Sequence, residues 1–461
     1  MSDSIDEKVF KPGDYELNKL ILINNRGIKL DILALVQEIS LYESIYNPSI
    51  EGQMVVTENT GLSTHFPIVG QEELEFEIKT PSPNKIQSIN FKKYRARVIG
   101  VESRKQLQNN TALYIVNFST KEAFKNTRNR VSQTFEGPAD LIIEDILRNN
   151  LKTNKNIFTE EALGLRKITI PNITPFTACQ RIASLAKSRV RNGAGYLFYE
   201  TFDGYHFRSF ESHFENPDGT PTTPLNRFYY QPNNQSSELS SQYVNIRDFV
   251  VEDRFDHLAR ANLGMYSSKT FTHDITTKSI KETNFNPFNS FYDKSHADTD
   301  GENLIGPTYP TGEDDEERNT FNDFNNNRIY VVPLSKHLYS RDSDDEQDYT
   351  THKSRIAEAE QTRNIMRTLR ISINVPGITD YRVGRMIEVF VPRNEKIEPG
   401  EIDVHHKMHS GRYLIAEIKH TFVQGYHTCQ IEAIKDSMPF VIPFGNSTRF
   451  TREAKGNTFG V

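Results

Sequence analysis

The stretch Gly52–Pro81, GQMVVTENTGLSTHFPIVGQEELEFEIKTP, indicates the fold of this chain most clearly. Within it, residues 73–80 alternate strictly between polar and apolar side chains, which is the pattern of a half-buried β-strand. One face of this strand then carries only apolar side chains. They are Leu74, Phe76 and Ile78.

A similar order of elements recurs near the C-terminus. The pair Val69-Gly70 precedes the first strand, and Val383-Gly384 precedes an apolar segment at residues 386–391. Behind each strand the pattern predicts a hairpin, with its turn at 106–111 in the first case and at 424–425 in the second. We therefore expect two β units of the same topology. They span residues 20–118 and 369–436, and strands near 245–265 are expected to complete the first.

Composition narrows the classes of function. The chain has 461 residues, enough for several domains, and a net charge of -6 argues against a general nucleic-acid binder. No signal peptide or bilayer-spanning apolar run is visible, which predicts a soluble protein made in a cytoplasm. Aromatic residues are 29 Phe and 20 Tyr without Trp, favouring a β-rich fold. Cys179 and Cys429 fit no metal or redox spacing, and we expect two buried free thiols.

Between the two β units the pattern predicts a compact α/β insert at 119–215. One helix is expected at 139–151, and a second begins at Pro175 with Thr174 as its cap. Phe176 and Ile182 should face a hairpin at 196–207. The remaining segments are an N-terminal segment at 1–19, a loop-rich β region at 216–368 and a tail at 437–461. The loop-rich region contains an acidic segment at 298–327 and a polar helix at 353–368.

No catalytic or cofactor motif is present, so we interpret the chain as non-enzymatic. His405, His406 and His409 lie close together in sequence, with His420 and His427 on the neighbouring hairpin. Glycine and proline on both sides of the first group predict a turn, whereas metal ligands at that spacing require a helix. We therefore favour an exposed polar loop over a metal site, and expect no bound cofactor.

Two blocks of sequence carry a resemblance to a known family. The first runs from Ile39 to Gly52, ISLYESIYNPSIEG, and continues into 57–72; the second comprises IPNITPF at 170–176 and NGAGYLFYE at 192–200. Across about residues 20–436 the chain resembles the central baseplate hub proteins of contractile-tailed bacteriophages. These proteins are related to the hub portion of type VI secretion spike proteins.

The resemblance implies an α+β, β-rich fold in which two similar tube-type β-barrels flank the inserted α/β domain. It also implies a homotrimer whose barrels form a pseudo-sixfold ring between the tail tube and the trimeric cell-puncturing spike. Expected partners are therefore the spike, tail tube or tube-initiator proteins and neighbouring baseplate proteins, while DNA and the tape-measure protein pass through the lumen without specific binding. The expected location is the virion tail baseplate, after assembly in the host cytoplasm.

Two groups of residues follow as candidates. Glu73, Glu75 and Glu77 are candidate channel-lining residues, because an acidic lumen repels phosphate, although the same face would also suit outer solvent or a neighbouring subunit. The tail run Phe440, Val441, Ile442, Pro443 and Phe444 is a candidate partner interface, since such a run is a liability when exposed. The alternatives are a tail-tip peptidoglycan hydrolase, or a host glycan- or receptor-binding module that uses aromatic residues at 266–292.

Overall fold

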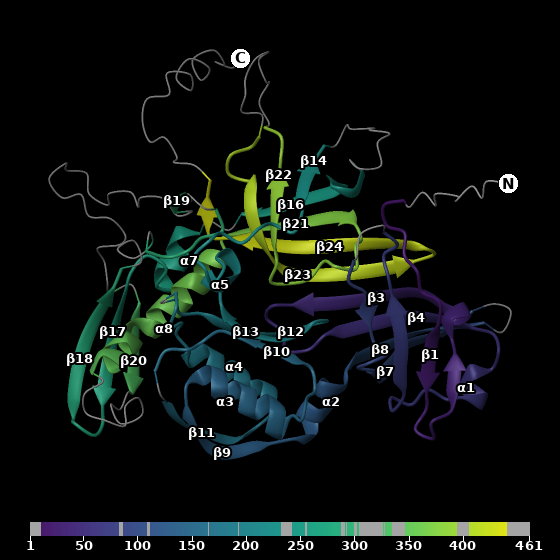
Figure 1. Ribbon diagram of the computed structural model, residues 1–461, viewed down its shortest axis with the longest axis horizontal. Coiled ribbons are helices and arrows are strands. Elements are labelled where there is room, and N and C mark those ends of the chain that lie inside the picture. The colour runs from purple at the N-terminus through teal and green to yellow at the C-terminus, as the bar shows by residue number, and fades with distance from the viewer. Residues whose placement is uncertain are drawn as a thin grey trace, which may run out of the picture.

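A computed structural model describes the chain over residues 11–439, with gaps at 83–85, 108–110, 165, 192, 232–241, 254–255, 287–290, 292, 299–301, 304–325, 327, 334–345 and 394–404. Its largest element is a 15-stranded sheet that contains strands of both predicted β units, and the predicted α/β insert packs beneath it (Figure 1). The chain is therefore β-rich with a helical minority, as predicted. No helix among these residues is long and apolar enough to cross a membrane.

The first β unit comes from the N-terminal part of the chain. Its apolar strand faces enclose one core, to which the predicted Leu74, Phe76 and Ile78 all contribute. Its elements are β1 (Leu20–Ile23), β2 (Lys29–Asp31), η1 (Leu33–Leu35), β3 (Val36–Ser44), β4 (Glu51–Glu58), α1 (Leu62–His65), β5 (Glu73–Ile78), β6 (Ile89–Asn90), β7 (Ala96–Gln106) and β8 (Ala112–Thr120).

The second β unit combines two distant parts of the sequence around a core of its own. Its elements are β14 (Arg227–Tyr230), β15 (Asn245–Ile246), β16 (Asp248–Asp253), β21 (Leu369–Pro376), β22 (Met386–Phe390), β23 (Gly411–Val423) and β24 (Tyr426–Lys435). β15 pairs with β14, and β16 pairs with β21. The expectation that residues near 245–265 complete the first unit is therefore wrong, because Phe249 and Val251 pack on the second core.

The two units repeat the same order of strands. The first runs β3-β4-β8-β7-β5 and the second β16-β21-β24-β23-β22, with every neighbouring pair antiparallel. A bulge falls at the same place in each, between Val98 and Gly100 in β7 and between Ile415 and Glu417 in β23. The glycines of the two Val-Gly pairs adopt φ of 87° and 77°, a left-handed conformation that favours glycine. The repeated order agrees with a duplicated unit.

One pairing joins the units into a single sheet. β3 runs antiparallel to residues 417–423 of β23, with Leu41 opposite His420. The first residues of β23 pair instead with β22, so this long strand has two different neighbours along the same edge. Among the described residues these pairings leave both units open and close neither into a barrel.

The insert forms a small α/β layer with its own core. Thr174 occupies the N-cap position of α4, but its hydroxyl contacts the Thr177 hydroxyl at 2.8 Å and makes no capping bond to the backbone, which corrects the predicted cap. Phe176 packs against the predicted hairpin, with ring centroids 6.1 Å from Phe198 and 6.0 Å from Tyr205. The elements are α2 (Lys121–Arg128), β9 (Val131–Gly137), α3 (Ala139–Asp145), η2 (Ile146–Asn150), β10 (Asn156–Thr159), β11 (Arg166–Ile173), α4 (Pro175–Leu185), β12 (Tyr196–Thr201), β13 (Gly204–Ser209) and α5 (Glu211–Phe214).

The region between the insert and the last β unit contains a long helix and a separate three-stranded sheet. The helix α8 (Glu346–Met366) covers residues 353–366 of the predicted polar helix and lies between that sheet and the insert (Figure 1). Most of the acidic segment, including residues 304–325, lies outside the described residues. The other elements are α7 (His257–Asn262), β17 (Ser268–Asp274), β18 (Ser279–Phe285), β19 (Glu302–Asn303), β20 (Ile329–Pro333) and β25 (Ser437–Met438).

Candidate functional site

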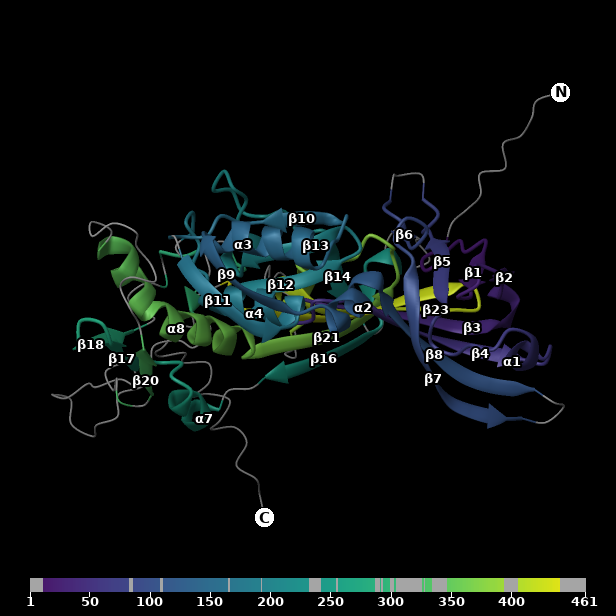
Figure 2. The same ribbon diagram turned by 90° about the horizontal axis from the view of Figure 1, so that it is seen from below.

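Two strand edges of the large sheet are open to solvent and form a candidate assembly site. β16 pairs with β21 on one side, and within the described residues no strand pairs with its other side. β7 pairs with β8 throughout but with β5 only at Ala96 and Arg97, and its far half projects from the body of the molecule together with β8 (Figure 2). Open strand edges of this kind are places where another chain can pair.

These two edges correspond to the two edges that meet inside the chain. In the repeated strand order β16 takes the place of β3, and β7 takes the place of β23. Residues 417–423 of β23, which follow its bulge, are those that pair with β3. The equivalent part of β7 begins at Gly100, again immediately after the bulge. Within the described residues, β16 and β7 thus present open edges at the positions that β3 and β23 use to join the two units.

The side chains on the two edges are complementary in charge. β16 has the sequence DFVVED, and its Val250 is 48 % exposed. The far half of β7 contains exposed Glu102, Arg104 and Lys105, and Ile99, just before it, is 53 % exposed. The excess of basic over acidic side chains there suits the acidic strand β16 better than either strand suits a second copy of itself.

The predicted channel-lining residues lie together on one face of β5, and each is part of an ion pair. Burial raises the pKa of Glu73, but hydrogen bonds from Arg95 and Arg97 outweigh this effect and hold the pKa below its ordinary value. Glu75 contacts Arg95 at 3.1 Å, and Glu77 contacts Lys92 at 2.8 Å. This face is therefore charge-paired, which weakens the argument from an acidic lumen. Their position in a channel stays a prediction, and the tail run Phe440–Phe444 lies outside the described residues.

A buried carboxylate connects the two β units with the insert. Glu43, on β3, accepts hydrogen bonds from the backbone N–H groups of Phe202 at 3.0 Å and Val383 at 3.2 Å. Burial raises the pKa of Glu43 to about 7, although the nearby Arg382 guanidinium acts in the opposite direction. One side chain thus holds together the seam between the units and the turn of the insert hairpin.

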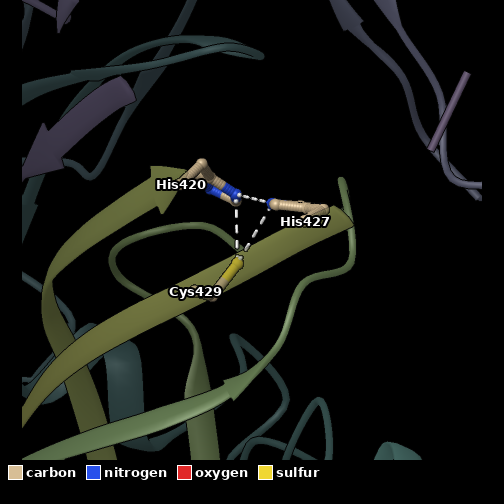
Figure 3. Close-up of side chains that lie close together, drawn as sticks. All are labelled: His420, His427 and Cys429. Atoms are coloured by element: carbon tan, nitrogen blue, oxygen red, sulfur yellow. Dashed lines mark hydrogen bonds between the residues drawn. The ribbon is translucent and has the colours of Figure 1, made fainter. Parts of the chain in front are cut away.

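The histidines singled out in the sequence fall into two groups. His406 and His409 stack with ring centroids 4.2 Å apart, and His405 packs near Phe390 at 5.0 Å. His420 and His427 lie elsewhere, on β23 and β24, and point toward Cys429 (Figure 3). Both cysteines are free and buried, as predicted. The grouping of Cys429 with two histidines was not expected from the sequence, although a two-residue hairpin turn places positions 420, 427 and 429 on one face.

A cleft of about 930 Å³ opens beside the insert hairpin. Within it the hydroxyl of Thr201 lies 3.0 Å from His206 Nε2, a contact that suggests nucleophile and base. However, burial lowers the pKa of His206 to about 3, and its ring stacks against Phe158 and Tyr199. A base this weak removes protons poorly at neutral pH, so the pair supports packing better than catalysis.

Comparison with known proteins places this fold among tail proteins. The sequence matches no family model and no curated protein. A tail protein from Neisseria meningitidis MC58 aligns with a TM-score of 0.52 at 11% identity, covering 92% of this chain and 97% of that one.

Two further solved structures align less closely. A 43 kDa tail protein of prophage MuSo2 from Shewanella oneidensis has a TM-score of 0.48 at 10% identity and covers 92% of this chain and all 100% of that one. An E. coli component of the type VI secretion system, described as similar to phage T4 tail proteins gp27 and gp5, has a TM-score of 0.43 at 9% identity, covering 89% and 76%. The chain therefore shares its fold with the tail protein from Neisseria meningitidis MC58.

Proposed function

We propose that this chain is a structural protein of a phage tail baseplate, a central hub that acts as a homotrimer without enzymatic activity. The observation that carries the proposal is the repeated junction. Among the described residues, one strand pairing joins the two β units, β3 against β23, and the strands equivalent to these two, β16 and β7, each present an open edge. The shared fold with a tail protein supports the setting.

The two open edges belong to different units and lie at opposite ends of the strand path β16-β21-β24-β23-β3-β4-β8-β7. If β16 of one copy pairs with β7 of the next, the interface is heterologous, and a heterologous interface closes when its rotation divides a full circle. Three chains then supply six similar β units around one axis. Such a ring matches a sixfold tail tube on one side and a trimeric spike on the other.

In this proposal, neighbouring copies complete the edges that remain open in one chain, and each unit becomes part of a tube-type barrel ring. The axial opening is the channel for DNA and the tape-measure protein, neither of which the ring binds specifically. The tail tube or tube-initiator proteins, the spike and neighbouring baseplate proteins are the partners, and the virion tail baseplate is the location.

The internal junction also gives the register of the contact between copies. Ser40 faces Thr421 across the internal seam. The strand pairings of the two units match Ser40 with Val250. They match Thr421 with Lys105, when the second bulge of β7, between Glu102 and Lys105, is taken into account. Cysteines at these two positions should therefore form a disulfide between copies of the chain.

The test is a doubly substituted chain, Val250→Cys with Lys105→Cys, oxidised and run on a non-reducing gel. We expect covalent species up to a trimer, because each copy offers one edge of each kind. Each single substitution should give no species beyond a dimer, and Val250→Cys combined with Val331→Cys, an exposed position on β20, controls for random collision. The native thiols are buried and should not interfere.

Charge reversal offers a second test of the same contact. Arg104→Glu with Lys105→Glu places acidic side chains opposite the acidic strand β16 and should weaken the trimer in sedimentation at low salt. Lys278→Glu with Lys281→Glu makes the same charge change on the exposed β17–β18 hairpin and should leave the mass unchanged. A chain that stays monomeric with spike and tube proteins present would contradict the hub proposal.

A further inference from the structure

We propose that His420, His427 and Cys429 form a buried binding site for a metal cation with a filled d shell, Zn²⁺ or Cu⁺, at the tip of the β23–β24 hairpin. Nitrogen and thiolate ligands suit these two ions better than oxygen-seeking Mg²⁺ or Ca²⁺. The inference does not depend on the proposed function, because it rests on the geometry of a single chain.

The three side chains converge on one point. His420 Nδ1 lies 3.0 Å from His427 Nε2, and Cys429 Sγ lies 3.2 Å from the first nitrogen and 3.4 Å from the second. Figure 3 shows both rings and the thiol directed at each other from the two strands. A triangle with these sides has a circumscribed radius of about 1.9 Å, close to the metal–nitrogen distance of about 2.0 Å and the metal–sulfur distance of about 2.3 Å. An ion therefore fits slightly above the plane of the three atoms with small outward shifts of the ligands.

Hydrogen bonds alone do not satisfy this arrangement. A neutral imidazole nitrogen either donates one proton or accepts, so at most two of the three close contacts can be hydrogen bonds. One of the three pairs of atoms would then lie in close contact without a hydrogen bond, in a site where all three side chains are fully buried. A cation accepts a lone pair from all three atoms at once, which satisfies every contact.

Binding requires the thiolate form of Cys429. The metal–sulfur bond therefore forms as the S–H bond breaks, and the proton leaves to solvent.

Charge distinguishes the two ions. Cu⁺ with one thiolate is neutral, whereas Zn²⁺ with one thiolate keeps a positive charge near the buried guanidinium of Arg382. Glu43, which lies 4.0 Å from Arg382, offsets part of that charge when ionised. Three ligands without a fourth are also more usual for Cu⁺ than for a structural zinc site, which is almost always four-coordinate.

The position of the cluster indicates what the ion would do. His420 faces Leu41 of β3 across the seam between the units. The backbone N–H of His427 donates to the Gly13 carbonyl at 2.7 Å, and the backbone N–H of Gly377 donates to the His427 carbonyl at 2.9 Å. A metal at this point would fix β23 against β24, and so stiffen the hairpin that β3 and the N-terminal segment pair with.

The test measures metal on the full chain, purified without a histidine tag. After anaerobic incubation with Zn²⁺ or with Cu⁺ and removal of excess metal, we expect about one ion per chain by elemental analysis, and an increase in the melting temperature. Cys429→Ser should lower the stoichiometry at least tenfold, while Cys179→Ser, which removes the other buried thiol, and His409→Ala should leave it unchanged.

Incubation with Zn²⁺ and Cu⁺ together separates the two ions, since the ion that the site prefers should still bind at about one per chain. In case Cys429→Ser does not fold, Co²⁺ replaces zinc in the unaltered chain, where a thiolate-to-cobalt charge-transfer band indicates sulfur ligation. Less than a tenth of an ion per folded chain with either metal, or loading that Cys429→Ser leaves intact, would overturn the proposal. Because these readouts are made on the chain whatever its oligomeric state, their failure would leave the trimer proposal untouched.

Discussion

Replacement of Gly52 by alanine should test how tightly the first β unit is packed. Gly52 lies on β4 opposite Leu41, and a Cβ atom added there would come within 2.3 Å of two ring atoms of Phe118 and 3.0 Å of Leu41 Cδ2. The Phe118 ring cannot easily move, since it is 2 % exposed and lies edge-on to Phe76 at 6.0 Å and to Phe91 at 6.4 Å.

The expected loss of stability is the difference of two effects. Overpacking of a filled core costs about 1 to 3 kcal/mol. Alanine recovers about 0.5 to 1 kcal/mol of the conformational freedom that glycine loses in a strand. We therefore expect Gly52→Ala to destabilise the first unit by about 1 to 2 kcal/mol.

The matched control is Gly100→Ala on β7, where an added Cβ would meet no atom within 4 Å. That change should be neutral or stabilising by about 0.4 to 1 kcal/mol. Thermal and urea unfolding of both variants gives the comparison, and Phe118→Leu combined with Gly52→Ala should recover part of the loss. Equal effects of the two glycine substitutions would refute the packing argument.

Three further predictions concern the insert, the seam and the β5 face. Phe176→Ala should lower the free energy of unfolding by about 3 to 5 kcal/mol, because the ring is only 5 % exposed and packs against the hairpin. Thr174→Ala should lower it by much less than the loss of a helix cap would, because the Thr174 hydroxyl contacts Thr177 and not the backbone. Equal shifts of the melting temperature for the two variants would contradict this. Glu43 has a pKa raised from 4.5 to about 7, so it takes up a proton on folding, and its contribution of about 3 kcal/mol is present below pH 4.5 and lost as pH rises through 7. Melting temperatures across pH 5 to 8 should therefore fall less steeply for Glu43→Gln than for the unaltered chain. Glu75→Gln should lower the free energy of unfolding in urea by less than about 1 kcal/mol, since its ion pairs lie near the surface. A larger loss would show that this face contributes more to stability than surface ion pairs do.

Periodicity in the sequence predicted local elements well where one face of the element is buried. The strand at 73–80, the hairpins of both units and the helix at Pro175 all appear near their predicted places. The cap of that helix is an exception, because the Thr174 hydroxyl contacts the Thr177 hydroxyl and makes no bond to the backbone.

What periodicity could not predict is the partner of each strand. Residues 248–253 read as a short apolar strand, and nothing in that pattern distinguishes the first unit from the second. Pairing is decided by which core Phe249 and Val251 can enter, and the edge of β4 that such a strand would need is already occupied by β3. Long-range pairing of this kind is a tertiary effect that local propensity does not encode.

The length of β23 shows how such a choice could produce the proposed assembly. Its first residues pair with β22 inside the second unit, and its last residues extend past that partner to receive β3 from the first. β7 extends past β5 in the same way, beyond Arg97, but among the described residues no strand pairs with that part of its edge. The strand that takes the place of β3 in the repeated order is β16, which pairs with β21 and packs on the second core. In the proposed assembly, a duplicated unit with one extended strand therefore satisfies half of these edges within one chain, and another copy satisfies the rest.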